Sequence, residues 1–243
     1  GSEMCIRDSP NTMEALKGIN RKVVTFGLVD GADVTAKNIH FSGASSNFDV
    51  YYDGQFLTDV TLHVPGIHNV RNALAATAAM VQLHVSPNAI KYGLAGFNGA
   101  GRRFEHKGTF HGAEVYDDYA HHPDEVQALL NAVRPLPHQR LILAFQPHTY
   151  TRTAALFDDF VNVLRQADRV VLAEIYAARE TNELGISSRD LAAQIPHSVY
   201  CPTLEQVADE LEKLAQPGDM IITVGAGDIY RAGEMLLKRG DAQ

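Results

Sequence analysis

Cysteine is scarce in this sequence. Its 243 residues include two cysteines, Cys5 and Cys201. Two are too few for a disulfide framework, and their spacing fits no zinc motif. A fold held together by disulfides or by structural zinc is therefore disfavoured, and we expect a reducing, cytoplasmic environment.

Long apolar runs and an excess of basic residues are also missing. No apolar run reaches the roughly 18 residues that a membrane span needs, and the N-terminus has no signal-peptide core. Lysine and arginine number 21 against 29 acidic residues, which gives a net charge of -8. This balance argues against nucleic acid or an anionic membrane as a partner, although a local basic pocket for phosphate is compatible with it.

The composition that remains is that of an ordinary globular protein, with 45% hydrophobic and 21% charged residues. The length allows one large domain or two smaller ones. Residues 1–9 begin with Gly-Ser, as cloning remnants often do, and match no periodic pattern. We therefore expect residues 1–19 to be a tag or disordered lead with a short linker.

Residues 20–99 begin with strand-like patterns. These cover residues 23–26, 48–52 and 55–64, and Asp53-Gly54 between the last two is a two-residue hairpin signal. An alanine-rich helix follows from residue 66 to about residue 83, and a short helix covers 88–94. The patterns predict antiparallel hairpins and a helical part, and not a complete domain.

Two asparagines stand at the start of the alanine-rich helix. Asn69 and Asn72 are three residues apart and therefore share a helical face. Their side-chain amides offer paired donors and acceptors, which can read the edge of a base. The alternative is that Asn69 only caps the helix.

Strands and helices alternate in residues 100–243. The expected strands are 113–116, 140–147, 170–173, 198–201 and 220–224, and the expected helices are 123–133, 152–166, 188–195, 204–214 and 229–239. Residues 141–145 are a continuous apolar run, which is typical of a buried parallel strand. The pattern predicts an α/β fold: a Rossmann-like, mostly parallel sheet with helices on both faces, preceded by the small hairpin and helix part.

The stretch Asp117-Asp118-Tyr119-Ala120-His121-His122-Pro123 lies where a predicted strand passes into a predicted helix. In an open α/β sheet, ligands bind at the carboxyl ends of the strands. Two carboxylates and two imidazoles at this position therefore indicate a binding or catalytic site. The alternative is that the aspartates cap the helix and the histidines are surface residues.

Three loops should meet at this edge of the sheet, because each follows a strand. They are residues 117–122, 146–152 and 174–180, which offer histidines, carboxylates and two arginines but no nucleophile with an obvious base. The set suits the holding of a phosphorylated or carboxylate substrate better than covalent catalysis. Residues 99–103 add two adjacent arginines beside glycines at a domain junction, and arginine is a good phosphate ligand. Gly225-Ala226-Gly227 lacks the third glycine of a dinucleotide fingerprint and follows the last strand, so that interpretation is disfavoured.

Five motifs, in the same order, resemble those of the peptidoglycan-building Mur ligases. They are residues 66–72 (GIHNVRN), 101–104 (GRRF), 117–123 (DDYAHHP), 145–148 (FQPH) with 151–153 (TRT), and 225–228 (GAGD). The resemblance covers residue 20 to the end. It implies that residues 20–99 are the C-terminal part of the central ATP-binding domain and residues 100–243 the C-terminal domain.

The resemblance also implies an activity in peptidoglycan precursor synthesis. In this family ATP phosphorylates the muramyl carboxylate, and the amine of an incoming amino acid attacks the acyl phosphate. The FQPH and TRT motifs favour UDP-N-acetylmuramate and L-alanine as the substrates over the tripeptide that a recycling relative uses.

Individual roles carried over from the family are equally implications of the resemblance. Asn69 and Asn72 would lie at the adenine of ATP, Arg102 at its phosphate and Asp118 at its ribose. The wall where L-alanine and the acyl phosphate meet would be formed by His148, Arg152 and His122. Thr149 stands where some members carry an arginine.

Parts of the family pattern are absent from this sequence. The phosphate-binding loop G-x-x-x-x-G-K-[ST], the Glu and His that hold magnesium, and the UDP-binding domain are all missing. We therefore expect a fragment that is inactive alone, that needs the missing domains of the same enzyme as partners, and whose ligands for ATP and Mg²⁺ lie mostly elsewhere, with no metal ligand assigned here. The alternatives are a tripeptide-recycling or other Mur ligase, or a non-catalytic Rossmann-like module that binds a nucleotide or a partner.

Overall fold

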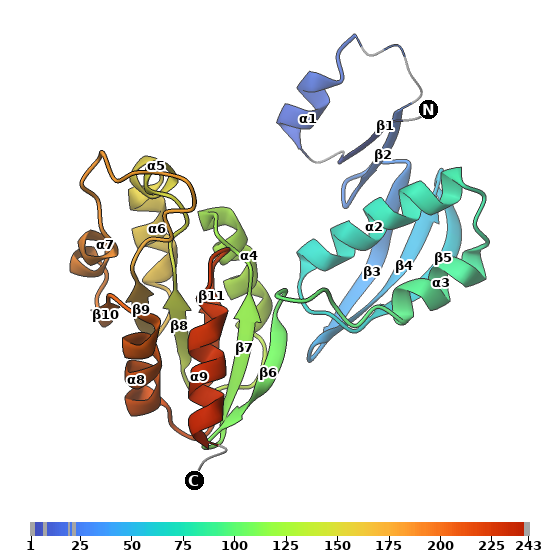
Figure 1. Cartoon of the computed structure of the whole chain (residues 1–243). Coiled ribbons are helices and arrows are strands. Elements are labelled where there is room, and N and C mark those ends of the chain that lie inside the picture. Colours follow the sequence, from blue (N-terminus) through green and yellow to red (C-terminus); the bar gives the residue numbers. More distant parts are fainter. Residues whose placement is uncertain (1–2, 7–8, 19, 21–22, 241–243) are drawn as a thin grey trace. The chain divides into compact units, whose positions relative to one another are not determined.

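The computed structural model describes residues 3–6, 9–18, 20 and 23–240. The chain divides into two compact units, residues 1–99 and 100–243 (Figure 1). Among the described residues, no helix is both long and apolar enough to cross a membrane.

The first unit is built on a mixed sheet with the strand order β1-β2-β3-β4-β5. Its elements are β1 (Glu3–Ile6), α1 (Pro10–Ala15), β2 (Val23–Gly27), β3 (Val34–Ser42), β4 (Ser45–Tyr52), β5 (Gln55–Leu62), α2 (Ile67–Gln82) and α3 (Pro87–Ala95). Strands β1, β2 and β3 pair in parallel, whereas β3, β4 and β5 pair antiparallel. Alternate residues of β4 and β5, such as Phe48 and Val60, are buried in one core with Val70 and Leu74 of α2.

The predicted hairpin between β4 and β5 is confirmed. Asp53 and Gly54 have φ values of 48° and 75°, as the two-residue turn with the right twist requires. Strand β3 was not expected from the sequence. Its alternation is weak because most of its second half is exposed, and the strand is irregular between Lys37 and His40.

The structure differs from the expected tag or disordered lead in residues 1–19. The backbone of β1 pairs in parallel with β2, from Glu3 opposite Val23 to Ile6 opposite Phe26. Helix α1 begins after Ser9, whose side-chain oxygen accepts a hydrogen bond from the Thr12 amide at 3.3 Å. Residues 1, 2, 7, 8 and 19, also part of the expected lead, lie outside the described residues.

The second unit contains a six-stranded sheet with the order β10-β9-β8-β11-β7-β6. Its elements are β6 (Glu105–Phe110), β7 (Ala113–Asp118), α4 (Pro123–Val133), β8 (Leu141–Phe145), α5 (Tyr150–Ala155), α6 (Phe157–Leu164), β9 (Arg169–Ala173), α7 (Ser188–Gln194), β10 (Ser198–Cys201), α8 (Leu204–Leu214), β11 (Met220–Val224) and α9 (Tyr230–Gly240). All pairings are parallel except that of β6 with β7. Together with the smaller unit before it, this sheet confirms the predicted fold class.

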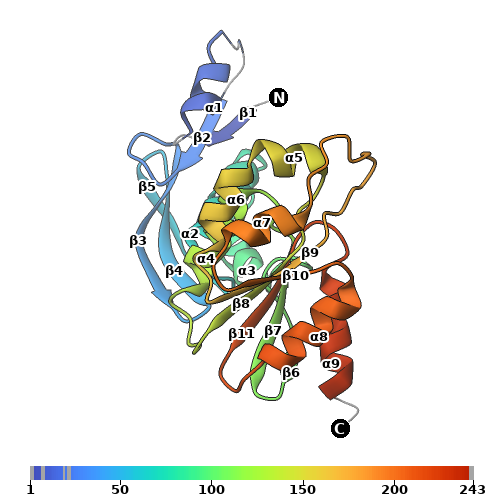
Figure 2. The ribbon, with the colours of Figure 1, turned by 90° about the vertical axis from the view of Figure 1, so that its left-hand side faces the viewer.

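Helices cover both faces of this sheet (Figure 2). Leu141, Leu143 and Phe145 of β8 enter the core under α4, α6 and α7, whereas Ile142 and Ala144 enter the core under α8 and α9. A strand buried on both faces has no polar face, which explains the continuous apolar run in the sequence.

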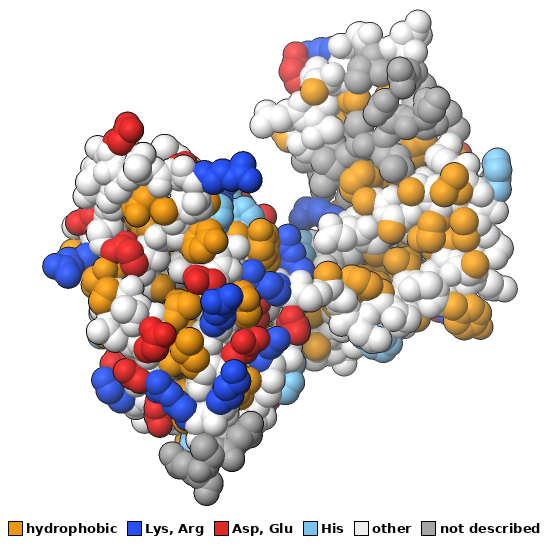
Figure 3. Space-filling view, in the orientation of Figure 1, with side chains coloured by type: hydrophobic (Ala, Val, Ile, Leu, Met, Phe, Trp, Pro, Cys, Tyr) orange, Lys and Arg blue, Asp and Glu red, His pale blue; other side chains and the backbone are white. Residues whose placement is uncertain are grey.

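Two expectations need correction in this unit. The helix expected over residues 152–166 is two helices, because Leu156 leaves the helical conformation with φ -116° and ψ 26°. Edge strand β6 was not expected, because its sequence EHKGTF is polar and its register shifts between His106 and Gly108. On the face seen in Figure 3, acidic and basic side chains are interspersed over the second unit.

Candidate active site

The strand order decides which loops meet in the second unit. Strand β11 lies between β7 and β8, and all three are parallel. The loop after β11, residues 225–229, therefore lies between the loops that follow β7 and β8. The loop after β9 joins them, since His148 forms an isolated parallel bridge with Tyr176. Thus four loops, and not the expected three, share this edge of the sheet.

The two aspartates at the end of β7 are buried, with exposed fractions of 1% for Asp117 and 7% for Asp118. Asp117 accepts hydrogen bonds from Arg102 Nε at 2.8 Å and from the Thr223 hydroxyl at 2.7 Å. Asp118 accepts from the amides of Phe104 and Ala120, both at 2.8 Å. Burial raises the pKa of the Asp118 carboxyl, and these two amides oppose the rise. Asp118 thus orders the backbone around it, Asp117 holds two side chains, and neither carboxylate caps α4.

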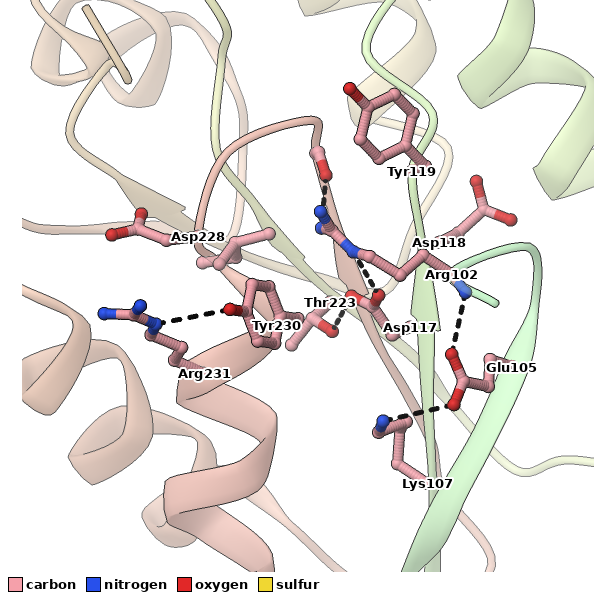
Figure 4. Close-up of polar contacts among 12 residues, drawn as sticks. Arg102, Glu105, Lys107, Asp117, Asp118, Tyr119, Thr223, Asp228, Tyr230 and Arg231 are labelled. Atoms are coloured by element: carbon pink, nitrogen blue, oxygen red, sulfur yellow. Dashed lines mark hydrogen bonds and ion pairs between the residues drawn. The ribbon is translucent and has the colours of Figure 1, made fainter. Parts of the chain in front are cut away.

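Arg102 lies beside Asp117 (Figure 4). Besides the bond to Asp117, its Nη1 donates to the Gly227 carbonyl at 3.1 Å and its Nη2 to the Gly225 carbonyl at 2.7 Å. All three guanidinium nitrogens therefore donate to the protein. The neighbouring Arg103 is exposed and contacts the Tyr119 ring at 5.5 Å. Its guanidinium makes no hydrogen bond or ion pair with any residue that the structure describes, so it is the freer cation of the two.

The two histidines after β7 have different surroundings. His122 is the N-cap of α4, and its Nδ1 accepts a hydrogen bond from the Asp124 amide at 3.3 Å. His121 donates from Nδ1 to the Tyr119 carbonyl at 3.0 Å, and its ring centre lies 6.0 Å from that of His148. The structure therefore brings His121, and not the expected His122, beside His148. Sequence spacing gave no signal to distinguish these neighbours.

His148 and Arg152 follow β8. The His148 ring stacks on Tyr176 with centres 5.5 Å apart, and its Nδ1 is buried. Burial, followed by the nearby Arg152, lowers the pKa of His148. The Nη1 of Arg152 is buried as well, and neither atom has a hydrogen-bond partner among the described residues. Two buried polar atoms with unused capacity thus lie at the carboxyl edge of the sheet.

The backbone at Thr149 sets this arrangement. Thr149 has a φ of 69°, which β-branched residues rarely adopt. Its amide donates to the Tyr176 carbonyl at 2.9 Å, and its carbonyl accepts from the Thr153 hydroxyl at 2.7 Å. These bonds hold the sharp turn into α5. Backbone strain of this kind is frequent at functional sites.

The loop after β9 is anchored by Glu174 and Glu180. Although burial opposes the shift, hydrogen bonds from Tyr200, the Ile175 and Ser188 amides and Ser187 lower the pKa of Glu174. Glu180 accepts from the Thr151 amide at 3.0 Å and from its hydroxyl, and these bonds lower the pKa of Glu180. The loop is therefore tied at both ends, with Tyr176 between them.

Gln146 connects β8 to the start of α9. Its Oε1 accepts from the amides of Asp228 at 3.0 Å and Ile229 at 3.1 Å, and its Nε2 donates to the Asp228 carboxylate at 3.0 Å. The FQPH motif thus has a structural role besides carrying His148. The sequence alone did not indicate it, because Gln146 is 82 residues from Asp228 and 83 from Ile229.

Asn69 and Asn72 belong to the first unit. The N-cap of α2 is Gly66, so Asn69 is not the helix cap. Its Nδ2 donates to the Pro65 carbonyl at 2.7 Å, and its Oδ1 accepts from Asn72 Nδ2 at 3.3 Å. Asn72 is exposed. The pair therefore presents the Asn72 amide to solvent with its orientation set by Asn69.

No group of three or more His, Cys, Asp or Glu side chains is placed to hold a metal ion in the part of the chain that the structure describes. The thiol of Cys201 is free and buried, and the side chain of Cys5 lies outside the described residues.

Comparison with known proteins gives a consistent result. Residues 102–227 match "Mur ligase, glutamate ligase domain", and residues 2–80 match "Mur ligase middle domain". UDP-N-acetylmuramate--L-alanine ligase of Clostridium novyi is 47% identical over 95% of this chain and 51% of its own length, and that of Lachnospira eligens is 48% identical over 89% and 49%.

Among solved structures, the UDP-N-acetylmuramate-alanine ligase of Thermotoga maritima has a TM-score of 0.74 and 28% identity, and covers 90% of this chain and 48% of that one. The chain thus spans about half the length of the relatives it matches. The resemblance inferred from the sequence motifs is confirmed, and the chain belongs to the Mur ligase family.

Proposed function

We propose that this chain is part of an ATP-dependent ligase that joins L-alanine to the carboxylate of UDP-N-acetylmuramate. Support comes from the relatives that are 47% and 48% identical and bear that name. The reaction would pass through an acyl phosphate, formed when the muramyl carboxylate attacks the terminal phosphate of ATP. The alanine amine would then displace the phosphate.

The observation that carries the proposal is the pair of buried, unpartnered atoms His148 Nδ1 and Arg152 Nη1. A buried polar atom without a partner costs free energy, so a ligand that bonds it is favoured. An amino acid offers both groups needed, a carboxylate for the guanidinium and an amine for the imidazole.

The lowered pKa of His148 supports this role. A histidine with a pKa below its ordinary value is mostly neutral near pH 7, and a neutral imidazole can accept a hydrogen bond from an amine. Arg152 would hold the carboxylate, which orients the amine for attack. His122, which caps α4, would contribute less directly than His121, whose ring centre lies 6.0 Å from that of His148.

The nucleotide contacts are proposed on each unit separately. On the first unit, the Asn69–Asn72 pair would read the adenine edge. On the second unit, Asp118 would lie near the ribose, mainly by ordering the backbone of Phe104 and Ala120. The phosphate contact fits Arg103 better than Arg102, because the Arg102 guanidinium is already bonded to Asp117, Gly225 and Gly227.

Mur ligases use Mg²⁺, which neutralises charge on the transferred phosphate. The described residues contain no cluster that fits this ion. We therefore assign no magnesium ligand on the chain and no step through the metal.

The proposal can be tested by reconstitution. The preceding half of the Clostridium novyi relative is fused ahead of this chain, and phosphate release is followed with ATP, UDP-N-acetylmuramate and one amine at a time. We expect L-alanine to drive turnover, and glycine, L-serine and the muramyl tripeptide to drive much less. Preferred use of the tripeptide would favour the recycling ligase instead, and a folded fusion that is inactive with every amine would refute the proposal.

A matched pair of variants separates the site from the scaffold. Arg152→Ala removes the proposed carboxylate contact, whereas Arg165→Ala removes an exposed arginine at the end of α6. Only the first should raise the L-alanine concentration needed for half-maximal turnover. This chain without the fusion should show no alanine-dependent ATP hydrolysis, since it lacks the phosphate-binding loop.

A further inference from the structure

The turn that opens the second unit, residues 100–104, has an unfavourable backbone. Arg102 and Phe104 have φ values of 58° and 47°, in a region that residues other than glycine seldom occupy. Two such residues in one turn persist only where the surroundings hold them. The contacts that hold this turn therefore decide where its side chains point.

Backbone contacts hold the turn against β7. The Tyr119 amide donates to the Arg102 carbonyl at 2.7 Å, and the Phe104 amide donates to Asp118 at 2.8 Å. The Arg102 amide donates to Glu105 at 2.7 Å, and this bond lowers the pKa of the Glu105 carboxyl. The Phe104 ring stacks on Tyr116 with centres 4.3 Å apart. These contacts fix the turn against β7 and the start of β6.

The Arg102 side chain adds a contact to a different loop. Its bonds to the carbonyls of Gly225 and Gly227 reach the turn between β11 and α9, more than 120 residues away in sequence. Its guanidinium also lies over the rings of Tyr119 at 5.1 Å and Tyr230 at 4.7 Å. Figure 4 shows the guanidinium reaching from the turn at Glu105 towards the loop above Tyr230. One side chain thus connects two loops of the candidate site.

The loop that Arg102 reaches is itself closely packed. A Cβ atom added at Gly227 would lie 2.3 Å from Gln146 Oε1, and one at Gly225 would lie 2.7 Å from the Gln146 carbonyl. The loop therefore sits directly on Gln146 and has little freedom to move. A guanidinium bonded to this loop is fastened to a rigid support.

We propose that Arg102 is a positioning residue, which fastens the turn 100–104 to the β11–α9 loop and so directs the Arg103 side chain outwards. The part that concerns phosphate rests on the function proposed above. Arg102 has its three nitrogens on protein acceptors and its partner Asp117 is buried, whereas Arg103 has no such partners. The two adjacent arginines of the GRRF motif therefore have different roles. Arg102 holds the turn in place, and Arg103 contacts the anion.

The test uses the ¹⁵N-labelled chain and amide hydrogen exchange. Arg102→Ala should raise exchange about tenfold at the Phe104 amide and at the Asp228 and Ile229 amides, relative to the change in the β8 amides. Exchange at these amides in Arg102→Lys should be faster than in the unsubstituted chain and slower than in Arg102→Ala, because one ammonium cannot replace three directed donors. Arg231→Ala is the control, since Arg231 contacts the same Tyr230 ring from an exposed position but reaches neither glycine carbonyl.

Removal of Arg102 also leaves the buried Asp117 without its cation, which could unfold the unit. The double variant Arg102→Ala with Asp117→Asn removes that unpaired charge and keeps the test possible. It should show the same raised exchange at Asp228 and Ile229. Exchange equal to that of the Arg231→Ala control at these amides would overturn the proposed fastening.

The anion contact is tested by adding sodium tripolyphosphate to the ¹⁵N-labelled chain. The NMR signals of the arginine Nε–H groups are followed during this titration. In the unsubstituted chain we expect the Arg103 signal to move and the Arg102 signal to stay, and in Arg102→Ala the Arg103 response should need about tenfold more ligand. Movement of the Arg102 signal together with that of Arg103 would make Arg102 a direct ligand and overturn its positioning role. If neither signal moves, the proposed phosphate contact of Arg103 fails, and the exchange rates alone decide whether Arg102 fastens the loop.

Discussion

Replacing Gln146 with leucine removes the side-chain bonds between β8 and the start of α9 while nearly preserving the volume. Gln146 is 5% exposed and makes three hydrogen bonds, two to backbone amides and one to the Asp228 carboxylate. Each such bond contributes about 0.5 to 1.5 kcal/mol net, and an unsatisfied buried donor costs about 1 to 3 kcal/mol. Since Ile229 is fully buried, its amide gains no direct access to water. We therefore expect Gln146→Leu to destabilise the second unit by about 2 to 4 kcal/mol.

The assay is amide hydrogen exchange of the β8 residues Leu143 and Phe145, which reports the opening of the second unit alone. The expected destabilisation corresponds to exchange that is roughly thirtyfold to several-hundredfold faster. Gln127→Leu is the matched control, because Gln127 of α4 bonds Asn131 and Gln166 at exposed positions. That change should cost less than about 0.5 kcal/mol. Equal effects of the two substitutions would refute the idea that the Gln146 side chain holds the start of α9 to β8.

Three further predictions concern the same sheet edge. His148 has a pKa below its ordinary 6.5 because of burial and Arg152, so the unfolded chain takes up a proton first as pH falls. The stability of the second unit should therefore decrease below about pH 6.5, and His148→Gln should flatten that decrease in urea titrations at pH 5 to 7. Arg152→Ala in the fused enzyme should lower kcat/KM for L-alanine by about 1.5 to 3 kcal/mol in transition-state terms; unchanged kinetics would make Arg152 structural. Gly227→Ala should destabilise the second unit by about 1 to 3 kcal/mol, because the new Cβ clashes with Gln146. Gly93→Ala in α3, with nothing within 4 Å of the new Cβ, should stabilise the first unit by about 0.5 to 1 kcal/mol. Thermal melts in which both substitutions change stability in the same direction would contradict this.

The sequence predicted most of the regular structure because the signals are local. Continuous apolar runs identified the buried strands such as β8, and a two-residue turn signal at Asp53 identified the hairpin between β4 and β5. The spacing of Val126, Leu129 and Val133 identified helix α4. The elements that were missed, β3 and β6, are polar and irregular strands whose hydrogen bonds are made with neighbours and not signalled by periodicity.

The candidate site was predicted as a set of motifs but not as a set of contacts. The motifs placed His148 and Arg152 on one loop, and the structure leaves a buried polar atom of each without a described partner. For two pairs of adjacent residues, the sequence assigned the ligand contact to one residue and the structure favours its neighbour. His121, and not His122, lies beside His148. Arg102 is bonded within the protein, whereas Arg103 is exposed. Adjacent side chains of the same type have the same sequence signature, so only the backbone conformation can separate them.

The sequence by itself thus determined the order of strands and helices, the family motifs and the end of the sheet at which they lie. Only the tertiary structure decided that β11 inserts between β7 and β8. This strand order brings Gly225 and Gly227 within reach of Arg102, and it allows Gln146 to form hydrogen bonds with Asp228. The physical reason is that periodicity and turn signals act over a few residues, whereas strand order and left-handed turns are set by contacts between residues that are distant in the chain.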